Sequence, residues 1–308
     1  MRVLVTGGAG FIGSHVVDTL LDHSYEVVVL DDLSTGRKSN LNPVVPLHVI
    51  DIRSESVGAI FEEVRPQAVI HLASQVSVSS SVRDPIRDAD INIRGTVKLL
   101  ELCQVYGVDR LVYSSTGGAL YGEPTQLPCP ETHQISPLSP YGASKYAAEG
   151  HIELFGRLYG QEYAILRYAN VYGPRQDPNG EAGVVAIFAK RMINEEKLVI
   201  FGDGSQERDF IYVGDIAKAT VEALDRGTGF ASNLGSGVGT SVQELFNRLR
   251  DVTGYLGEPV YLDERAGDVY KIYLDTSRAR KKLKWVPEVS LEEGLRLTVA
   301  SLYGQNAE

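Results

Sequence analysis

Short apolar runs alternate with helix-forming stretches through the first two-thirds of the chain, and this rhythm constrains the fold more than any other feature. The stretches that separate most of the runs have helical period, as in IGSHVVDTLLD and YAAEGHIELFGRLYG. Apolar strands that alternate with helices form a parallel sheet covered on both faces. We therefore predict an α/β protein with a Rossmann-type doubly wound parallel sheet. The apolar runs are VLVT (3–6), EVVVL (26–30), PLHVI (46–50), AVIHLA (68–73), RLVYSS (110–115) and EYAILRYA (162–169).

The rhythm loosens after about residue 170. A loop rich in Gly and Pro (172–183) precedes a mixture of short strands and helices, and the tail is predicted to hold helices at 241–253 and 290–303. We expect a smaller mixed α/β substrate-binding lobe that is interleaved with the first domain. The predicted boundaries are 1–170 for the nucleotide-binding domain, with 209–235 returning to it, and 171–208 plus 236–308 for the second lobe.

Composition narrows the classes of partner. The net charge of −10 and the pI near 5.2 argue against nucleic acid or an anionic membrane as the main partner. Two cysteines, Cys103 and Cys129, are too few for a disulfide framework, and no Cys/His spacing suggests zinc or another metal. No apolar run reaches the roughly 18 residues of a membrane span, and the first ten residues lack a signal-peptide core. The expected location is the cytoplasm.

The stretch VLVTGGAGFIGSHVVDTLL holds the strongest local motif. Gly7, Gly10 and Gly13 follow a predicted strand directly and open an amphipathic helix. Glycines allow a tight turn and a close approach of a pyrophosphate to the backbone, while the helix N-terminus offers free N–H groups. A bare strand-to-helix turn is the alternative, but this context favours dinucleotide binding.

The second strand ends in two acidic residues, Asp31 and Asp32. Asp31 lies 18 residues after Gly13, where a carboxylate can accept a hydrogen bond from a ribose 2′-hydroxyl. A 2′-phosphate would be repelled by both carboxylates, so the predicted cofactor is NAD. Arg37 and Lys38 lie close enough to leave NADP open.

The stretch SPYGASKYAAE (139–149) begins like a helix, with Ser139 as its cap and Pro140 at its first position. Tyr141 and Lys145 are four residues apart and share one face of that helix. Taken alone, this pair is more often a surface contact than a catalytic pair. The hydroxyls of Ser114, Ser115 and Thr116 end the fifth strand, where Tyr141 could meet them. His71 ends the fourth strand and is expected to be a packed residue rather than a base.

Taken together, these motifs resemble those of the extended short-chain dehydrogenase/reductase family, over essentially the whole chain. The stretches LRYANVYGPRQ (166–176), RDFIYVGDIA (208–217) and ERAGDV (264–269) resemble the family's nucleotide-sugar-modifying members. The resemblance implies that Tyr141 is the acid/base and that Lys145 supports it. Lys145 and a positive nicotinamide ring would both lower the pKa of the phenol. Thr116 is the preferred partner hydroxyl, with Ser115 and Ser114 as alternatives.

Two sets of ligand-binding residues follow from the motifs and the resemblance. The predicted cofactor-binding residues are Gly7, Gly10, Phe11, Ile12, Gly13, Asp31, Asp32, Ser34, Thr35, Gly36, Asp51, Ile52, Leu72, Ala73, Ser74, Gln75, Asn92, Ser114, Tyr141, Lys145 and Tyr168. The predicted substrate-binding residues, for a nucleoside diphosphate sugar, are Thr116, Tyr141, Asn170, Gly183, Val184, Val199, Phe201, Arg208, Arg265 and Asp268.

The residues after Thr116 bear on the reaction. Relatives that dehydrate or decarboxylate their sugar carry Asp-Glu or Glu there, whereas this chain has Gly117 and Gly118. TGGALYG instead resembles the UDP-glucose 4-epimerase branch, and this reaction is the favoured prediction. Alternatives are C4 epimerisation of UDP-N-acetylglucosamine or UDP-glucuronate, a dehydrogenase or reductase with net NAD(P) turnover, and a non-catalytic NAD-binding protein.

Two further expectations concern the sugar pocket and assembly. Ile272 takes the place of a bulky Tyr in some relatives and could admit an N-acetylated hexose, and residues 77–81 could line the same pocket. A homodimer is expected because relatives pair two long helices, here roughly 87–107 and 141–160, into a four-helix bundle.

Overall fold

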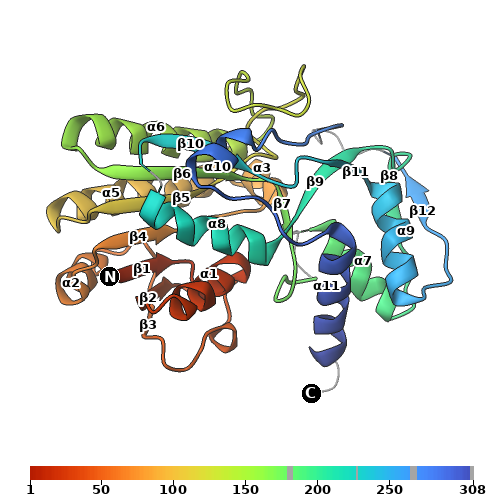
Figure 1. Cartoon of the computed structure of the whole chain (residues 1–308), viewed down its shortest axis with the longest axis horizontal. Helices are drawn as coiled ribbons and strands as arrows, with labels where there is room; N and C mark the ends of the chain where they lie inside the picture. Colours follow the sequence, from red (N-terminus) through yellow and green to blue (C-terminus); the bar gives the residue numbers. More distant parts are fainter. Residues whose placement is uncertain (179–182, 227, 264–268, 306–308) are drawn as a thin grey trace.

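The computed structural model describes residues 1–178, 183–226, 228–263 and 269–305. Its centre is a seven-stranded parallel sheet with the order β10-β6-β5-β4-β1-β2-β3 (Figure 1). The strand order reverses between β1 and β4, which creates the crevice at the carboxyl ends where doubly wound sheets bind ligands. The strands are β1 (Arg2–Thr6), β2 (Glu26–Asp31), β3 (Leu47–Val49), β4 (Ala68–His71), β5 (Arg110–Thr116), β6 (Glu162–Tyr168) and β10 (Phe230–Leu234).

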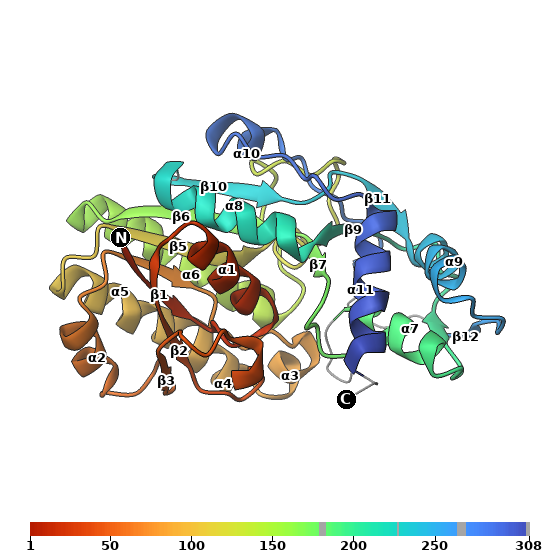
Figure 2. The same cartoon turned by 60° about the horizontal axis from the view of Figure 1, so that its bottom comes forward.

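Helices cover both faces of this sheet (Figure 2). On one face lie α1 (Phe11–Asp22) and α8 (Val213–Arg226), and on the other lie α2 (Val57–Val64), α5 (Gly95–Val105) and α6 (Pro140–Tyr159). Successive strand residues point to opposite faces, so Val3 and Val5 enter one core while Leu4 enters the other. This arrangement confirms the predicted Rossmann-type sheet.

The predicted helix 87–107 is interrupted in the structure. Short helices α3 (Val78–Arg83) and α4 (Pro85–Ala89) come first, and a π-helical segment η2 (Asp90–Arg94) then leads into α5. π-helical turns of this kind are rare and often accompany functional sites. Elsewhere, one turn of 3₁₀ helix, η1 (Lys38–Asn40), lies between β2 and β3.

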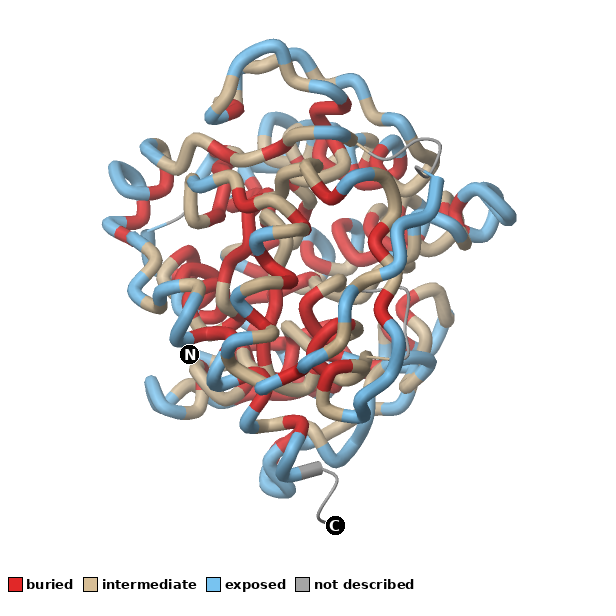
Figure 3. The backbone as a smooth tube through the Cα atoms, turned by 90° about the vertical axis from the view of Figure 1, so that its right-hand side faces the viewer, coloured by how far each residue is buried: buried red, intermediate tan, exposed pale blue. Residues whose placement is uncertain are grey.

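The remaining elements pack beside the carboxyl end of the sheet around a core of their own (Figure 1). β7 (Asn170–Tyr172), β9 (Glu207–Tyr212) and β11 (Gly239–Ser241) form one small sheet, and β8 (Val199–Phe201) pairs with β12 (Val260–Leu262). The helices here are α7 (Val184–Ile193), α9 (Val242–Thr253) and α11 (Leu291–Gln305), while α10 (Ser277–Lys282) lies against β10. Figure 3, viewed from the side of the second group, shows buried residues gathered toward the middle of the molecule and exposed residues around its edge.

Segments distant in sequence complete the large sheet. β10 pairs in parallel with β6, and α8 packs against α1 although about 200 residues separate them in the chain. No helix in the described ranges is both long and apolar enough to cross a bilayer.

Candidate active site

The glycine turn after β1 is shaped by three close approaches. Gly7 has a φ of +70°, and a Cβ there would lie 2.6 Å from the Ala73 backbone nitrogen. A Cβ on Gly13 would lie 2.0 Å from the Gly7 carbonyl oxygen, and one on Gly10 would lie 3.2 Å from it. Within the described chain, no side chain caps the start of α1. Its first N–H groups therefore face a cradle that only glycines leave open, as a pyrophosphate requires.

Asp31 ends β2 and is buried beside this turn. Its Oδ2 accepts a hydrogen bond from the Ala9 N–H and its Oδ1 accepts one from the Leu33 N–H, both at 2.9 Å. A Cβ on Gly36 would lie 2.7 Å from Oδ1, so the loop closes tightly around the carboxylate. Burial raises the pKa of Asp31, and the two backbone N–H groups oppose that rise.

The next predicted contact, Asp51, is bound by a neighbour. Its carboxylate pairs with Arg53, which holds its pKa below the ordinary value, and Arg53 also contacts Asp90 of η2 at 2.6 Å. Ile52 is buried against Gly95, the first residue of α5. Residues 51–53 therefore contact both η2 and the first residue of α5.

His71 is a core residue, as expected. Its Nδ1 lies 2.7 Å from the Thr6 hydroxyl and its Nε2 lies 3.0 Å from the Thr96 hydroxyl. Because Thr96 donates its own proton to the Asn92 carbonyl, Nε2 must carry the imidazole proton and Nδ1 must accept. Burial lowers the pKa of His71 to about 3, so the ring stays neutral.

The three hydroxyls at the end of β5 have different partners. Thr116 hydrogen-bonds to the Tyr141 phenol, whereas Ser114 bonds to Tyr168. Ser115 is buried and donates to Glu149 Oε1 at 2.5 Å, so its assignment as a catalytic hydroxyl is wrong. Ser115 and Thr116 both contact α6, but Ser115 meets Glu149, about two turns beyond Tyr141, whereas Thr116 at the end of the strand meets the Tyr141 phenol.

Tyr141 and Lys145 lie in the first two turns of α6, with the Ser139 hydroxyl capping the helix at the Gly142 N–H. Burial raises the pKa of Tyr141 to about 12, and the Thr116 hydrogen bond opposes this rise. Burial also lowers the pKa of Lys145 to about 7, while its ammonium lies 4.4 Å from the centre of the Tyr113 ring. Tyr141, Lys145 and Thr116 by themselves therefore do not give the expected lowering of the phenol pKa.

The other predicted cofactor residues gather at the carboxyl ends of β1, β2 and β4. Residues 72–75 follow β4, and the Gln75 N–H donates to Asn92 Oδ1 at 2.9 Å. Tyr168 is buried, and its hydroxyl lies 2.7 Å from that of Thr220 on α8. The structure thus gives the Tyr168 hydroxyl a packing role, and a cofactor contact through that hydroxyl is not supported.

Apart from Thr116 and Tyr141, the predicted substrate residues that the structure describes lie on the second group of elements. Asn170 starts β7, and its Oδ1 would lie 3.5 Å from a Cβ on Gly118. Gly183 and Val184 open α7, and Val199 and Phe201 bound β8. Arg208 on β9 donates to the carbonyls of Glu207 and Tyr270. Arg265 and Asp268 lie outside the described residues.

Ile272 and residues 77–81, both expected at the sugar pocket, have different surroundings in the structure. Ile272 is buried in a small cluster with Tyr121, Cys129 and Leu274, so it packs in a core here rather than facing open solvent. Residues 78–83 form α3, which the Ser77 hydroxyl caps.

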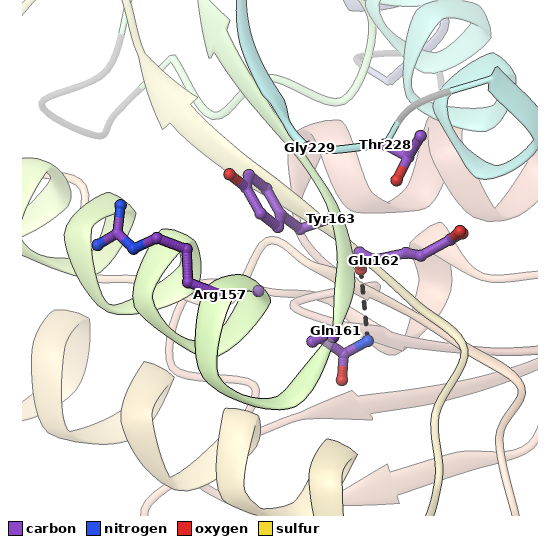
Figure 4. Close-up of a pocket in the computed structure, with 8 residues that line it drawn as sticks. Arg157, Gln161, Glu162, Tyr163, Thr228 and Gly229 are labelled. Carbon is purple, nitrogen blue, oxygen red and sulfur yellow. Dashed lines mark hydrogen bonds between the residues drawn. The ribbon is translucent and has the colours of Figure 1, made fainter.

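A hollow of about 310 Å³ lies elsewhere, between the end of α6 and the starts of β6 and β10 (Figure 4). It is about 24 Å along α6 from Tyr141, at 1.5 Å per residue. Its distance from the catalytic pair excludes it as the candidate site. The lining residues are Gly156, Arg157, Gly160, Gln161, Glu162, Tyr163, Thr228 and Gly229.

Sequence reasoning missed two buried carboxylates next to the pair. Glu149 lies one turn beyond Lys145 and is paired with Arg167 at 2.6 Å, and Asp88 of α4 is buried near both Tyr141 and Lys145. The four-residue spacing of Tyr141, Lys145 and Glu149 is a signal that could have identified Glu149. Asp88 had no such signal.

Comparison with known proteins identifies the family of this chain. Residues 3–235 match the model of the NAD dependent epimerase/dehydratase family. The chain belongs to this family. NAD is therefore its cofactor, and the glycine cradle with the buried Asp31 fits that group. Gly7, Gly13 and the start of α1 fit the pyrophosphate, and Asp31 fits a ribose hydroxyl.

Individual relatives match across nearly their whole length. A UDP-glucose 4-epimerase from Mycolicibacterium smegmatis is 43% identical, with 97% of each chain covered. The structure of the Thermotoga maritima UDP-glucose 4-epimerase with UDP-glucose is 52% identical, with a TM-score of 0.98 and 100% of each chain covered. The Thermus thermophilus UDP-glucose 4-epimerase complex with NAD is 44% identical, with a TM-score of 0.94 and 99% of each covered.

Proposed function

We propose that this protein is a UDP-glucose 4-epimerase, which interconverts UDP-glucose and UDP-galactose through a transient 4-keto sugar. The observation that carries the proposal is the pairing of Thr116 with Tyr141 next to two glycines, Gly117 and Gly118. Neither glycine carries a side chain that could act as the additional acid or base that dehydration or decarboxylation needs. Relatives named for the same reaction support this proposal.

The side chains divide the chemistry among them. Tyr141 takes the proton of the sugar 4-hydroxyl and holds it on its phenol oxygen until the keto group is reduced again. Thr116 shares that proton through its bond to the phenol, and the Lys145 ammonium favours the phenolate form. Bound NAD supplies the hydride acceptor and, once reduced, the hydride donor. Return of hydride to the other face of the 4-keto sugar inverts C4.

A sugar that turns within the site must be anchored at its other end. We propose that Arg208 binds the diphosphate, with Asn170 and the backbone of Gly183 and Val184 contacting phosphate or sugar oxygens. Val199 and Phe201 would lie beside the uracil. Arg265 and Asp268 are proposed as a second phosphate clamp and a ribose acceptor.

The proposed division of labour follows the two groups of elements. Residues 1–170 and 209–235 would hold NAD through the glycine turn, Asp31, Asp32, residues 34–36, the 51–52 and 72–75 loops, and Asn92. Residues 171–208 and 236–308 would bind the nucleotide sugar. The free thiols of Cys103 and Cys129 are both buried, which fits a reducing compartment, and we propose a cytoplasmic location.

We also propose a homodimer built on α5 and α6. Five large side chains on these helices are exposed, with Val105 and Leu158 exposed by 67% and 62%. A face of this kind favours a protein partner, and a second copy would pair the same helices isologously. The exposed residues are Val105, Tyr146, Leu154, Leu158 and Tyr159.

The dimer is tested by sedimentation analysis. Leu158→Glu should shift the protein to a monomer, and a wild-type monomer at micromolar concentration would contradict the proposal.

The reaction is tested by incubating purified protein with UDP-glucose, UDP-N-acetylglucosamine and UDP-glucuronate in turn, followed by proton NMR of the sugar. UDP-galactose should form from UDP-glucose without stoichiometric NADH release. Tyr141→Phe should abolish conversion, while Tyr146→Phe, a change at an exposed tyrosine of the same helix, should not. Conversion of another sugar alone would reassign the substrate, and net NADH production would indicate a dehydrogenase.

A further inference from the structure

A buried carboxylate beside the Tyr141–Lys145 pair has no part in the chemistry above. Asp88 lies on α4 and is 1% exposed. Its Oδ1 accepts hydrogen bonds from Gln75 Nε2 at 2.8 Å and from Asn92 Nδ2 at 3.2 Å. Its Oδ2 is buried and has no hydrogen-bond partner among the described residues. An unpaired buried carboxylate oxygen is costly, so Asp88 is expected to have a role that offsets this cost.

Hydrogen bonds connect Asp88 to the turn that carries Tyr141. The Asn92 side chain also donates to the Ser144 hydroxyl at 3.1 Å, and that hydroxyl donates to the Tyr141 carbonyl at 3.0 Å. Asn92 belongs to the π-helical segment η2, which follows α4 directly. Asp88 therefore holds Asn92 in place against the first turn of α6.

Charge provides the second connection. The ionisable groups that face Lys145 are Glu149 on its own helix, Asp88 on α4, neutral His71 on β4 and Tyr113 on β5, together with Tyr141. Both carboxylates favour the ammonium form of Lys145 and oppose the effect of burial.

These two carboxylates differ in their pairing. Glu149 already forms an ion pair with Arg167, whereas no ion pair within the described ranges involves Asp88. The negative charge of Asp88 is thus the one not already offset by a guanidinium.

We propose that Asp88 is a positioning residue for the catalytic pair: its charge keeps Lys145 in the ammonium form, and its hydrogen bonds fix Asn92 against the start of α6. The catalytic consequence rests on the proposed function, because the ammonium of Lys145 is what favours the phenolate of Tyr141. The effect on Lys145 itself does not depend on which substrate the enzyme uses.

The first test measures the titration of Lys145 directly. NMR of the lysine side chains, with the Lys145 signal assigned by its absence in Lys145→Arg, gives its pKa in wild type and in Asp88→Asn. Loss of an opposite charge at this range should lower the pKa of Lys145 by about one unit or more. Asp88→Glu keeps the charge and should restore most of the wild-type value.

A matched control is available at Asp84, four residues before Asp88. Asp84 is exposed and caps α4 at the Arg87 N–H, a bond that asparagine also makes. Asp84→Asn should leave the Lys145 titration unchanged. Asp88→Ser serves as a second uncharged variant if circular dichroism shows that Asp88→Asn is not folded. An unchanged Lys145 pKa in a folded, uncharged variant overturns the proposal.

Kinetics provide the second test. With UDP-glucose, the alkaline limb of the kcat profile of Asp88→Asn should move to lower pH by the same amount as the Lys145 pKa, and KM should stay within about threefold of wild type. A loss confined to KM, or one equal at all pH values, would indicate a merely structural role and would contradict the proposal. If wild-type protein does not epimerise UDP-glucose, the proposed function fails, and the NMR titration still decides the role of Asp88.

Discussion

The guanidinium of Arg167 on β6 binds both carboxylate oxygens of Glu149 on α6, at 3.0 and 2.6 Å. The two side chains are only 6% and 2% exposed. Arg167 also donates to the Tyr121 hydroxyl, which in turn donates to Asn233 on β10. Because Ser115 on β5 donates to the same carboxylate, one network joins the helix that carries Tyr141 and Lys145 to three strands of the sheet.

Removing Arg167 should leave a buried, unpaired charge on Glu149. We expect Arg167→Met to lower the free energy of unfolding by about 3–5 kcal/mol in urea denaturation. The double variant Arg167→Met with Glu149→Leu should recover most of that loss, because no charge is then left unpaired. A single variant within about 1 kcal/mol of wild type would show that the ion pair does not contribute in this way.

Thr116 should matter for the reaction and Ser115 should not. Thr116→Val removes the hydroxyl that bonds to Tyr141 and should lower kcat about a hundredfold, whereas Thr116→Ser should retain activity. Ser115→Ala removes only the bond to Glu149, so its effect should be on stability. Initial rates of epimerisation decide between them, and equal losses in Thr116→Val and Ser115→Ala would contradict the assignment.

The glycine cradle offers a graded test of cofactor binding. Gly13→Ala places a Cβ 2.0 Å from the Gly7 carbonyl oxygen, so the turn must open and affinity for NAD should fall by at least tenfold. Gly10→Ala meets the same atom at 3.2 Å and should have a smaller effect. Titration calorimetry with NAD measures both. Equal affinities for the two variants would argue against the cradle.

His71 should make the fold sensitive to acid. Its pKa is about 3 in the folded protein against an ordinary 6.5, so the unfolded state binds the extra proton between these values. Stability contributed by the neutral ring is complete above pH 6.5 and declines as pH falls toward 3. The decline at pH 5 is about 2 kcal/mol. Comparison of urea unfolding at pH 7.5 and pH 5 should show a smaller difference in His71→Asn than in wild type.

Much of the architecture could be predicted because the buried strands are uniformly apolar. Runs such as 26–30 and 68–73 can be identified as central strands without any knowledge of tertiary contacts. The sequence does not predict α3, because serines favour turns, but Ser77 caps this helix and Ser81 is buried in the fold. The three-residue strand β11 pairs with β9, a contact that sequence patterns do not reveal.

The candidate site was predictable to the extent that its signals are local. Gly7, Gly13, Tyr141 and Lys145 depend on spacing within one turn or one helix. Asp88 depends on a tertiary arrangement, since only the folded chain shows that α4 lies against α6 and buries a carboxylate. The partner of each β5 hydroxyl likewise depends on how α6 lies along the end of the strand, which places Glu149 at Ser115 and Tyr141 at Thr116.

The late arrival of β10 has a consequence for synthesis of the chain. β6 is complete at Tyr168, but its neighbour β10 ends at Leu234, so 66 more residues (169–234) must be made before that edge is covered. At roughly 5–20 residues per second, translation leaves this edge unpaired for about 3 to 13 s. During that interval the nascent sheet presents open hydrogen-bonding groups to any other strand, which makes this edge the place where chaperones or mispairing would act first.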